Sequence, residues 1–138
     1  LLDTSLRRAG AEVERSCPVD EPVALCDANR LEQVLINLVG NALDAMTDQR
    51  KPQLELRWEC AAGMVRLHVR DHGPGLSDEA LSHLFEPFFT TKPDGLGLGL
   101  PICKTIIEAH GGRLWAEPNQ ETPGMCFSFS LPCHELSA

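Results

Sequence analysis

The sequence lacks the features that mark membrane-spanning and nucleic-acid-binding proteins. No apolar run approaches the roughly 20 residues that a membrane-spanning helix needs. Basic residues are few, with 12 Lys and Arg against 20 Asp and Glu, and the net charge is -8. A surface for nucleic acid or lipid would carry a basic patch. We therefore expect no nucleic-acid binding and no direct membrane contact, whereas an anionic nucleotide can still be held by local groups.

Cysteine patterns typical of zinc sites are missing as well. The six cysteines form no CxxC pair and no Cys/His cluster with zinc spacing. An apolar content of 43% is enough to build a core without covalent crosslinks. We therefore expect buried, reduced thiols in a cytosolic protein rather than three disulfides.

Length and sequence patterns predict one α+β domain over residues 1–138. Helices are expected at about 31–46 and 99–110, with a shorter helix that is capped by Ser77 and reaches Leu84. Strands are expected at about 11–17, 23–26, 53–60, 64–70, 113–117 and 125–131. This order predicts a mostly antiparallel sheet with helices on one face. Because the first residue is Leu rather than Met, we interpret the chain as a piece of a longer protein.

The first long helix carries a polar stripe on a mostly apolar surface. At about 100° per residue, four polar side chains fall within about 80° of one another: Gln33, Asn37, Asn41 and Asp44. Apolar residues occupy the opposite side, and Ile36 and Leu43 extend that surface further round. Amide and carboxylate oxygens are suitable ligands for Mg²⁺, so the stripe could line a polar cavity. A hydrated helix face explains the same pattern equally well.

A sharp turn follows the strand expected at 64–70 and begins with Asp71. Gly73 and Gly75 allow the backbone to turn tightly and to approach a ligand closely. The carboxylate of Asp71 could accept a hydrogen bond from an exocyclic amine such as that of adenine. An ordinary turn rich in Asp, Gly and Pro is the simpler interpretation of this segment alone.

A second glycine-rich segment precedes the helix expected at 99–110. Its glycines alternate with leucines from Gly95 to Leu100, and Lys92 is the nearest positive charge. Amides of such a loop, together with the helix N-terminus, can contact phosphate oxygens. The segment matches neither GxxxxGK[ST] nor GxGxxG, which excludes a P-loop and a Rossmann fingerprint. A mobile linker is the alternative, although it would expose the leucines without purpose.

Taken together and in this order, the segments resemble the sequence boxes of sensor histidine kinases, in particular the nitrogen- and oxygen-sensing branches. Residues 31–45 are similar to the N box, and residues 71–75 resemble the first glycine box. Residues 84–92 resemble the F box, and residues 95–100 resemble the second glycine box. The chain is therefore identified as a member of this family, namely the catalytic and ATP-binding domain of a two-component kinase.

The resemblance implies the Bergerat fold, an α/β sandwich that holds Mg²⁺-ATP between helices and a mobile lid. Asn41 would hold the Mg²⁺, and Asn37 would lie near the metal and the phosphates. Asp71 would accept a hydrogen bond from the adenine amine, and Gly73 and Gly75 would shape the adenine pocket. Residues 1–22 would form an N-terminal edge segment.

The lid implied by the resemblance covers residues 85–99. Thr91 and Lys92 would lie close to the phosphates, and Phe85, Phe88 and Phe89 would pack at the base of the lid. Three glycines would act as hinges, and three leucines complete the box, all six being expected ATP-binding residues: Gly95, Gly97 and Gly99, with Leu96, Leu98 and Leu100. Asp44 matches the N box and is included among the ATP-binding residues without an assigned role.

One position separates a kinase from the related ATPases. Gyrase-type, mismatch-repair and chaperone members of the fold resemble one another in having a Glu four residues before the metal-binding Asn. Here that residue is Asn37, and an amide cannot act as a general base at neutral pH. We therefore expect the domain to hold ATP and to donate its γ-phosphoryl group to a histidine. A self-sufficient ATPase and a non-catalytic nucleotide-binding module are the alternatives.

None of the five histidines lies in a long helical hairpin, so we expect the acceptor to lie outside this chain. The expected partners are the dimerisation and acceptor helices of the same kinase and, downstream, the receiver domain of a response regulator. The domain is expected to be cytoplasmic, whether the parent protein is soluble or membrane-anchored.

Overall fold

The computed structural model describes residues 12–16, 28–87 and 99–132. Its elements follow the predicted order, which confirms the α+β class: β1 (Glu12–Ser16), α2 (Ala28–Ala45), β2 (Gln53–Ala61), β3 (Met64–Arg70), α3 (Asp78–Ser82), α4 (Gly99–Ala109), β4 (Arg113–Pro118) and β5 (Met125–Pro132). The strand expected at 23–26 lies outside the described residues. No helix within the described ranges is long and apolar enough to cross a membrane.

One sheet of five strands, in the order β1-β2-β3-β5-β4, organises the domain. Strands β1 and β2 are parallel, and the other neighbouring pairs are antiparallel, as predicted. The β2–β3 hairpin turns through Ala62 and Gly63, whose φ angles are 52° and 74°. Positive φ at both central residues matches the right-handed twist of the two strands.

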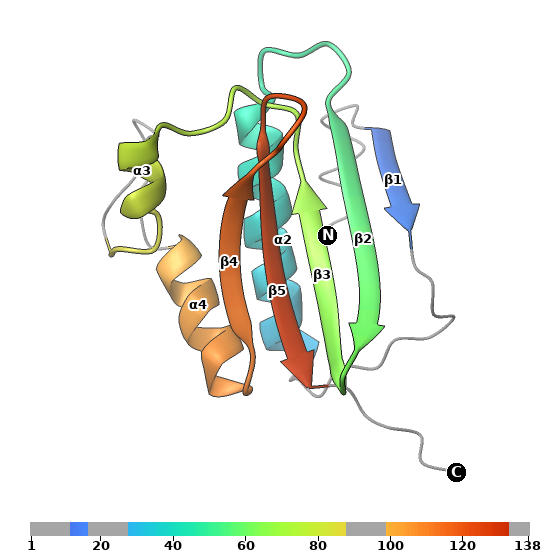
Figure 1. Cartoon of the computed structure of the whole chain (residues 1–138), viewed down its shortest axis with the longest axis vertical. Coiled ribbons are helices and arrows are strands. Elements are labelled where there is room, and N and C mark those ends of the chain that lie inside the picture. Colours follow the sequence, from blue (N-terminus) through green and yellow to red (C-terminus); the bar gives the residue numbers. More distant parts are fainter. Residues whose placement is uncertain (1–11, 17–27, 88–98, 133–138) are drawn as a thin grey trace.

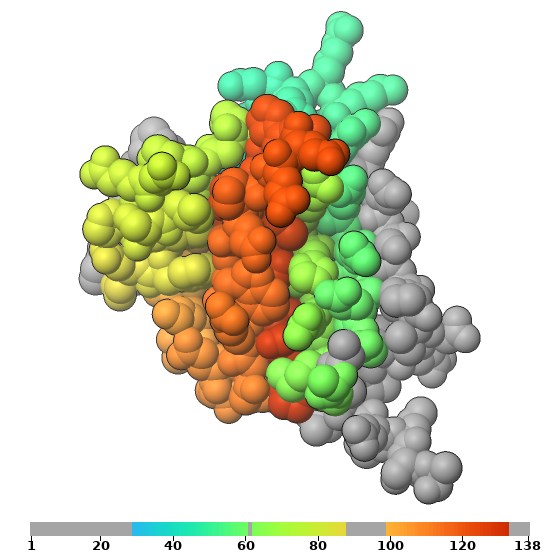
Figure 2. Space-filling view, in the orientation of Figure 1, coloured from blue at the N-terminus to red at the C-terminus, as the bar shows by residue number. Residues whose placement is uncertain are grey.

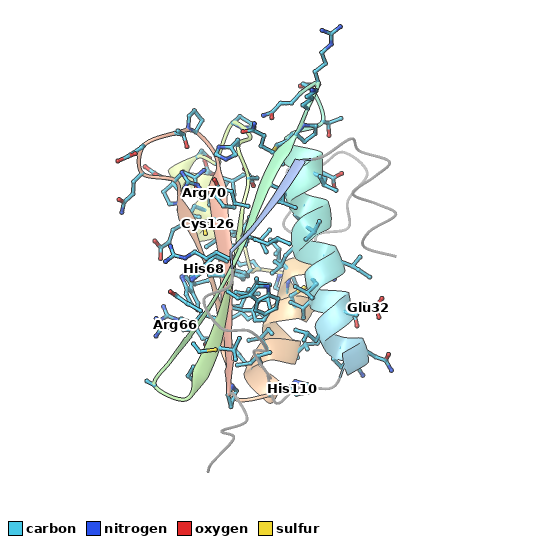
Figure 3. The ribbon with its side chains drawn as sticks, turned by 90° about the vertical axis from the view of Figure 1, so that its right-hand side faces the viewer. Glu32, Arg66, His68, Arg70, His110 and Cys126 are labelled. Atoms are coloured by element: carbon cyan, nitrogen blue, oxygen red, sulfur yellow. The ribbon has the colours of Figure 1, made fainter. Side chains whose placement is uncertain are left out.

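Helices cover one face of the sheet, as Figures 1 and 3 show. Strand alternation turns one set of side chains towards them, including Val65, Leu67 and Val69 on β3. Helix α2 lies across this face and packs against α4 and β3. The core it closes includes Val34, Leu38, Ala42 and Met46 of α2. The opposite face of the sheet is not covered by any helix of the described ranges.

Local signals fix the ends of α3 and α4. The hydroxyl of Ser77 accepts a hydrogen bond of 3.1 Å from the backbone N–H of Ala80, which confirms the predicted cap of α3. Helix α4 ends in a Schellman arrangement, in which the N–H of Gly112 donates to the carbonyl of Ile107 at 2.9 Å. Gly111 has a φ of 81°, a conformation that favours glycine.

Helix α2 differs from its prediction in two respects. It begins at Ala28, three residues before the expected start at about residue 31. The apolar surface is also narrower than expected, because Ile36 is 38% exposed. The helix buries only the stripe that meets the sheet and α4, and Ile36 lies outside that stripe.

Candidate functional site

Three segments singled out in the sequence come together along the C-terminal half of α2. These are the polar stripe of α2, the turn that follows β3, and the N-terminus of α4 (Figure 1). A β-carbon added at Gly73 would lie 2.7 Å from the carbonyl oxygen of Ala45, so the turn touches the end of α2. A β-carbon added at Gly99 would lie 3.4 Å from Oδ1 of Asn37, so α4 begins against the stripe.

Asp71 is the buried acidic group of this site, with 2% of its surface exposed. Its Oδ1 accepts hydrogen bonds from the backbone N–H groups of Gly73 at 3.0 Å and Met125 at 3.1 Å. Within the described part of the chain, both bonds to the carboxylate use this one oxygen. Oδ2 therefore remains able to accept a hydrogen bond from a ligand.

Two opposing effects act on the ionisation of Asp71. Burial raises the pKa of its carboxyl group above the ordinary value, because the charged form loses hydration. The two backbone N–H donors lower the pKa and offset part of this shift. A carboxylate kept in such a place is costly until a further donor reaches it, and a ligand amine would be that donor.

The turn from 71 to 75 needs the glycines that the sequence places there. At Gly73, an added β-carbon would also meet the Cβ of Ala45 at 3.0 Å, so the turn and α2 approach more closely than any side chain permits. Gly75 has a φ of 82°. The side chain of Gln49 donates to the carbonyl of His72 at 2.6 Å, which ties the turn to the loop after α2. The predicted tight turn is confirmed, and its close approach to a ligand stays a prediction.

The polar stripe of α2 is not uniform. Asn37 and Asn41, one helical turn apart, are half-buried, whereas Gln33 and Asp44 at the two ends are exposed. The middle of the stripe is therefore its less exposed part. Glu32 is exposed and lies nine residues, or about two and a half turns, before Asn41. It lies on the opposite side of the helix, and Figure 3 shows it away from the sheet.

Asn37 makes a contact that the sequence did not reveal. Its side chain is hydrogen-bonded with the thiol of Cys103, which is completely buried in α4 one turn after Gly99. Burial raises the pKa of this thiol to about 11, and the bond to Asn37 offsets part of the shift. The thiol therefore stays protonated at neutral pH. The only sequence signal related to this contact was the expectation that the cysteines are buried, reduced thiols.

The N-terminus of α4 is the third part of the site. The helix begins at Gly99, and Pro101 occupies its first turn, where a missing N–H costs nothing. Leu100 packs against the core. The other expected lid residues lie outside the described residues: Phe88, Phe89, Thr91, Lys92, Gly95, Leu96, Gly97 and Leu98.

A fourth segment, between β4 and β5, was missed by the sequence analysis. The side-chain amide of Asn119 donates to the backbone carbonyl of Asp71 at 2.8 Å. The backbone N–H of Asp71 donates to the carbonyl of Met125 at 2.9 Å. No sequence signal indicates these contacts, since they depend on β3 and β5 being neighbours in the sheet.

Comparison with known proteins shows the family of this chain. The profile of the family described as "Histidine kinase-, DNA gyrase B-, and HSP90-like ATPase" matches residues 26–135. The chain belongs to this family. The sensor protein FixL of Bradyrhizobium diazoefficiens is 41% identical over 127 residues, which cover 91% of this chain and 25% of that protein. The chain thus spans about a quarter of the length of this curated relative.

Solved structures support the same assignment. The nucleotide-free catalytic domain of the histidine kinase ThkA is similar, with a TM-score of 0.82, 35% identity, and coverage of 95% of this chain and 84% of that chain. The structure of ThkA in complex with the response regulator protein TrrA is also similar, with a TM-score of 0.79 and 34% identity. This match covers 96% of this chain and 37% of that chain. The Bergerat fold and the resemblance to sensor histidine kinases are confirmed.

Proposed function

We propose that this domain binds Mg²⁺-ATP and donates the γ-phosphoryl group to a histidine on a separate dimerisation segment of its parent sensor kinase. The observation that carries the proposal is the amide of Asn37, which lies beside the start of α4, four residues before Asn41. A hydrolytic member of the family needs a base there, and an amide provides none. ATP held without hydrolysis remains available for transfer.

Asp71 recognises the base of the nucleotide in this proposal. Its Oδ2 accepts a hydrogen bond from the adenine amine, while Oδ1 stays bonded to Gly73 and Met125. Guanine presents a carbonyl oxygen at the equivalent position, and two acceptors facing each other repel. The carboxylate therefore selects ATP over GTP. Gly73 and Gly75 keep the wall of the pocket close to the base.

The phosphates and Mg²⁺ lie between α2 and the start of α4. Asn41 holds the metal through its amide oxygen, Asn37 lies near the metal and the phosphates, and Asp44 borders the site from the exposed end of the stripe. This donor set suits Mg²⁺, which accepts oxygen ligands and keeps several waters and substrate phosphates in its shell. When bound, the ion neutralises charge on the β- and γ-phosphates. The helix N-terminus at Gly99 adds backbone N–H groups and a partial positive charge.

The lid at residues 85–99 completes the site. Thr91 and Lys92 approach the phosphates, and the segment from Gly95 to Gly99 lets the lid swing. Phe85, at the start of this segment, is half-buried against the core and supports its base. Residues 1–22 form the N-terminal edge segment of a single domain.

The histidines of the described residues are engaged in structural contacts. The ring of His68 lies on the uncovered face of the sheet, 2.7 Å from the hydroxyl of Ser128 and 2.8 Å from a carboxylate oxygen of Glu59. His83 pairs with Glu86 at 2.9 Å, and the ring of His110 is 2.7 Å from a backbone carbonyl of its own helix. None of these residues is placed as an acceptor on an exposed helical hairpin. This supports the proposal that the acceptor lies on another segment of the parent protein.

The partners follow from this arrangement. The acceptor helices of the same kinase must dock against the phosphate end of the site, and a response regulator then takes the phosphoryl group. ThkA has been crystallised in complex with the response regulator protein TrrA, which supports this part of the proposal.

Transfer of label tests the proposal. The domain is mixed with Mg²⁺, γ-labelled ATP and the helical acceptor segment of its parent protein, and acid-labile phosphohistidine is measured. We expect label on the acceptor histidine with the wild type and with Gln33→Ala, which changes an exposed end of the stripe, and no label with Asn41→Ala. Steady release of phosphate without transfer would instead indicate a self-sufficient ATPase. Tight ATP binding with neither activity would indicate a nucleotide-binding module.

A further inference from the structure

The pairing of β3 with β5 changes its hydrogen-bond pattern at Asp71. Regular register ends at Arg70 opposite Cys126, and Asp71 lies opposite Met125. Opposite residues of an antiparallel pair alternate between hydrogen-bonded and non-hydrogen-bonded positions, and at a hydrogen-bonded position the two residues exchange both backbone hydrogen bonds. Here only one is present, from the N–H of Asp71 to the carbonyl of Met125. The N–H of Met125 donates instead to Oδ1 of the Asp71 side chain.

This exchange leaves the backbone carbonyl of Asp71 without its usual partner in the ladder. Asn119 replaces that partner, because its side-chain amide donates to this carbonyl at 2.8 Å. The same amide group also donates to the carbonyl of Pro123 at 3.2 Å. One side chain thus connects the carbonyl of Asp71 to the β4–β5 turn, defined as residues 119–124.

The β4–β5 turn is shaped to allow this contact. The backbone N–H of Asn119 donates to the carbonyl of Gly124 at 3.0 Å, which closes the turn. Gly124 has a φ of 124°, and an added β-carbon there would overlap the carbonyl oxygen of Asp71 and lie 2.6 Å from Nδ2 of Asn119. Any side chain at this position would therefore separate Asn119 from Asp71.

A second, more exposed contact holds the turn from outside. The guanidinium of Arg70 donates to the hydroxyl of Thr122 at 3.3 Å and pairs with Glu55 at 3.4 Å. Figure 3 places Arg70 on the face of the sheet away from the helices, and Figure 2 shows the turn at the upper end of β4 and β5 on that face. Exposed ion pairs stabilise little, so Asn119 is the stronger of the two anchors.

We propose that Asn119 is a positioning residue for adenine recognition, which acts by holding the backbone carbonyl of Asp71 so that the carboxylate, and not that carbonyl, bonds to Met125. The inference rests on the proposed role of Asp71 in binding adenine. Without the amide of Asn119, the carbonyl of Asp71 can recapture the N–H of Met125 as in a regular ladder. The carboxylate then loses one of its two fixed donors, and Oδ2 is no longer aimed at the base.

The test compares the dissociation constants of ATP and GTP, measured by calorimetry well below the melting temperature. Asn119→Ala removes both donated hydrogen bonds, and we expect ATP to bind about tenfold more weakly, the value of one to two hydrogen bonds, while GTP binding changes little. Gln120→Ala, in the same turn and exposed, is the matched control and should behave as the wild type. Asn119→Gln, which keeps the donor group, should recover part of the preference for ATP.

A purely structural role for Asn119 predicts a different result. The melting temperature would fall, and the affinities for ATP and for GTP would decrease by the same factor. An unchanged ratio of the two affinities in Asn119→Ala would therefore overturn the inference. If Asn119→Ala does not fold, the ratio of the ATP and GTP affinities is measured on Asn119→Ser instead. The single hydroxyl proton of serine cannot donate to both carbonyls, so an unchanged ratio would again overturn the inference. A wild type that does not prefer ATP over GTP would contradict the role of Asp71 itself, which separates failure of the proposed function from failure of this inference.

Discussion

The proposed adenine end and the proposed phosphate end of the site are built differently. At the adenine end, Asp71 is buried and its surroundings are joined by hydrogen bonds from Gly73, Met125 and Asn119. At the phosphate end, Asn37 and Asn41 are half-buried on α2, and Asn37 lies beside the start of α4. The surroundings of Asp71 are fixed by hydrogen bonds among the described residues, whereas the half-buried amides of α2 are proposed to receive their partners from a ligand.

This difference indicates a separate function for each end of the site. Groups fixed before binding lose little entropy when the ligand arrives, so the adenine end can supply selectivity at low cost. The phosphate end must accept a charged ligand, a metal and finally an acceptor histidine. Half-buried amides beside a helix N-terminus can contact each of these groups, because an amide forms hydrogen bonds with charged groups and is itself uncharged. We therefore expect substitutions at the two ends to affect different steps.

The largest expected effect is at the phosphate end. Asn41→Ala removes the proposed metal ligand, and phosphoryl transfer should fall by about a hundredfold or more. The preference for ATP over GTP should remain, because Asp71 is unchanged. Transfer rates and nucleotide affinities of this variant and of the control Gln33→Ala provide the measurement. Loss of base preference together with transfer would mean that the two ends are not separate.

Asp71→Asn should have the next largest effect, at the adenine end. The two backbone donors keep an oxygen of the amide in the place of Oδ1, so the NH₂ group takes the place of Oδ2 and faces the adenine amine. ATP affinity should fall by about 10- to 100-fold, and GTP should gain relative to ATP.

The same variant also has a predicted effect on stability. Because burial raises the pKa of Asp71 in the folded state, the charged carboxylate lowers the free energy of unfolding above that pKa. Asp71→Asn should therefore be as stable as the wild type or more stable at pH 7, as measured by urea unfolding. Asp48→Asn, at an exposed position, should change neither property. A strongly destabilised Asp71→Asn would show that the carboxylate is a structural group rather than a recognition group.

A smaller effect is expected where the adenine turn touches α2. Gly73→Ala places a β-carbon against the backbone of Ala45, and the resulting shift should cost about 1–3 kcal/mol of stability and weaken ATP binding. Gly40→Ala is the matched control within α2. Its added β-carbon has no atom within 4 Å, so the helix should gain up to about 1 kcal/mol. Equal effects of the two substitutions on the melting temperature would contradict the close packing of the turn.

The smallest expected effect involves the thiol that contacts Asn37. The pKa of Cys103 is raised from 9.0 to about 11, so between these values the unfolded chain loses its thiol proton while the folded chain keeps it. The stabilisation from this thiol is therefore complete below about pH 9 and declines as pH rises towards 11. The free energy of unfolding of the wild type, measured in urea, should therefore fall over this pH range more than that of Cys103→Ala. At pH 8, iodoacetamide should modify the exposed Cys60 and leave Cys103 intact.

Local signals predicted most of the fold. The helices expected at 31–46 and 99–110, the strands expected at 53–60 and 64–70, and the Ser77 cap each depend on residues close together in the chain. The turn at Asp71 was also predicted, because its glycines have a direct conformational meaning. These features follow from periodicity and backbone geometry alone.

The missing parts of the site are contacts across the fold. Met125 reaches Asp71 over 54 positions of sequence, and only the placement of β5 beside β3 creates this pair. The pairing of Cys103 with Asn37 likewise needs α4 packed on α2. Sequence periodicity indicates which face of a helix or strand is buried, but it does not indicate which other element covers that face. The exposure of Ile36 was missed for the same reason.

The most direct test is a crystal structure of the domain with Mg²⁺ and a non-hydrolysable ATP analogue. We expect the adenine amine within about 3 Å of Oδ2 of Asp71, with Gly73 and Met125 still bonded to Oδ1. We also expect the amide oxygen of Asn41 at about 2.1 Å from the metal. An adenine amine bonded elsewhere, or a carboxylate that releases Met125 to receive it, would contradict the claim that this end of the site is built before the nucleotide binds.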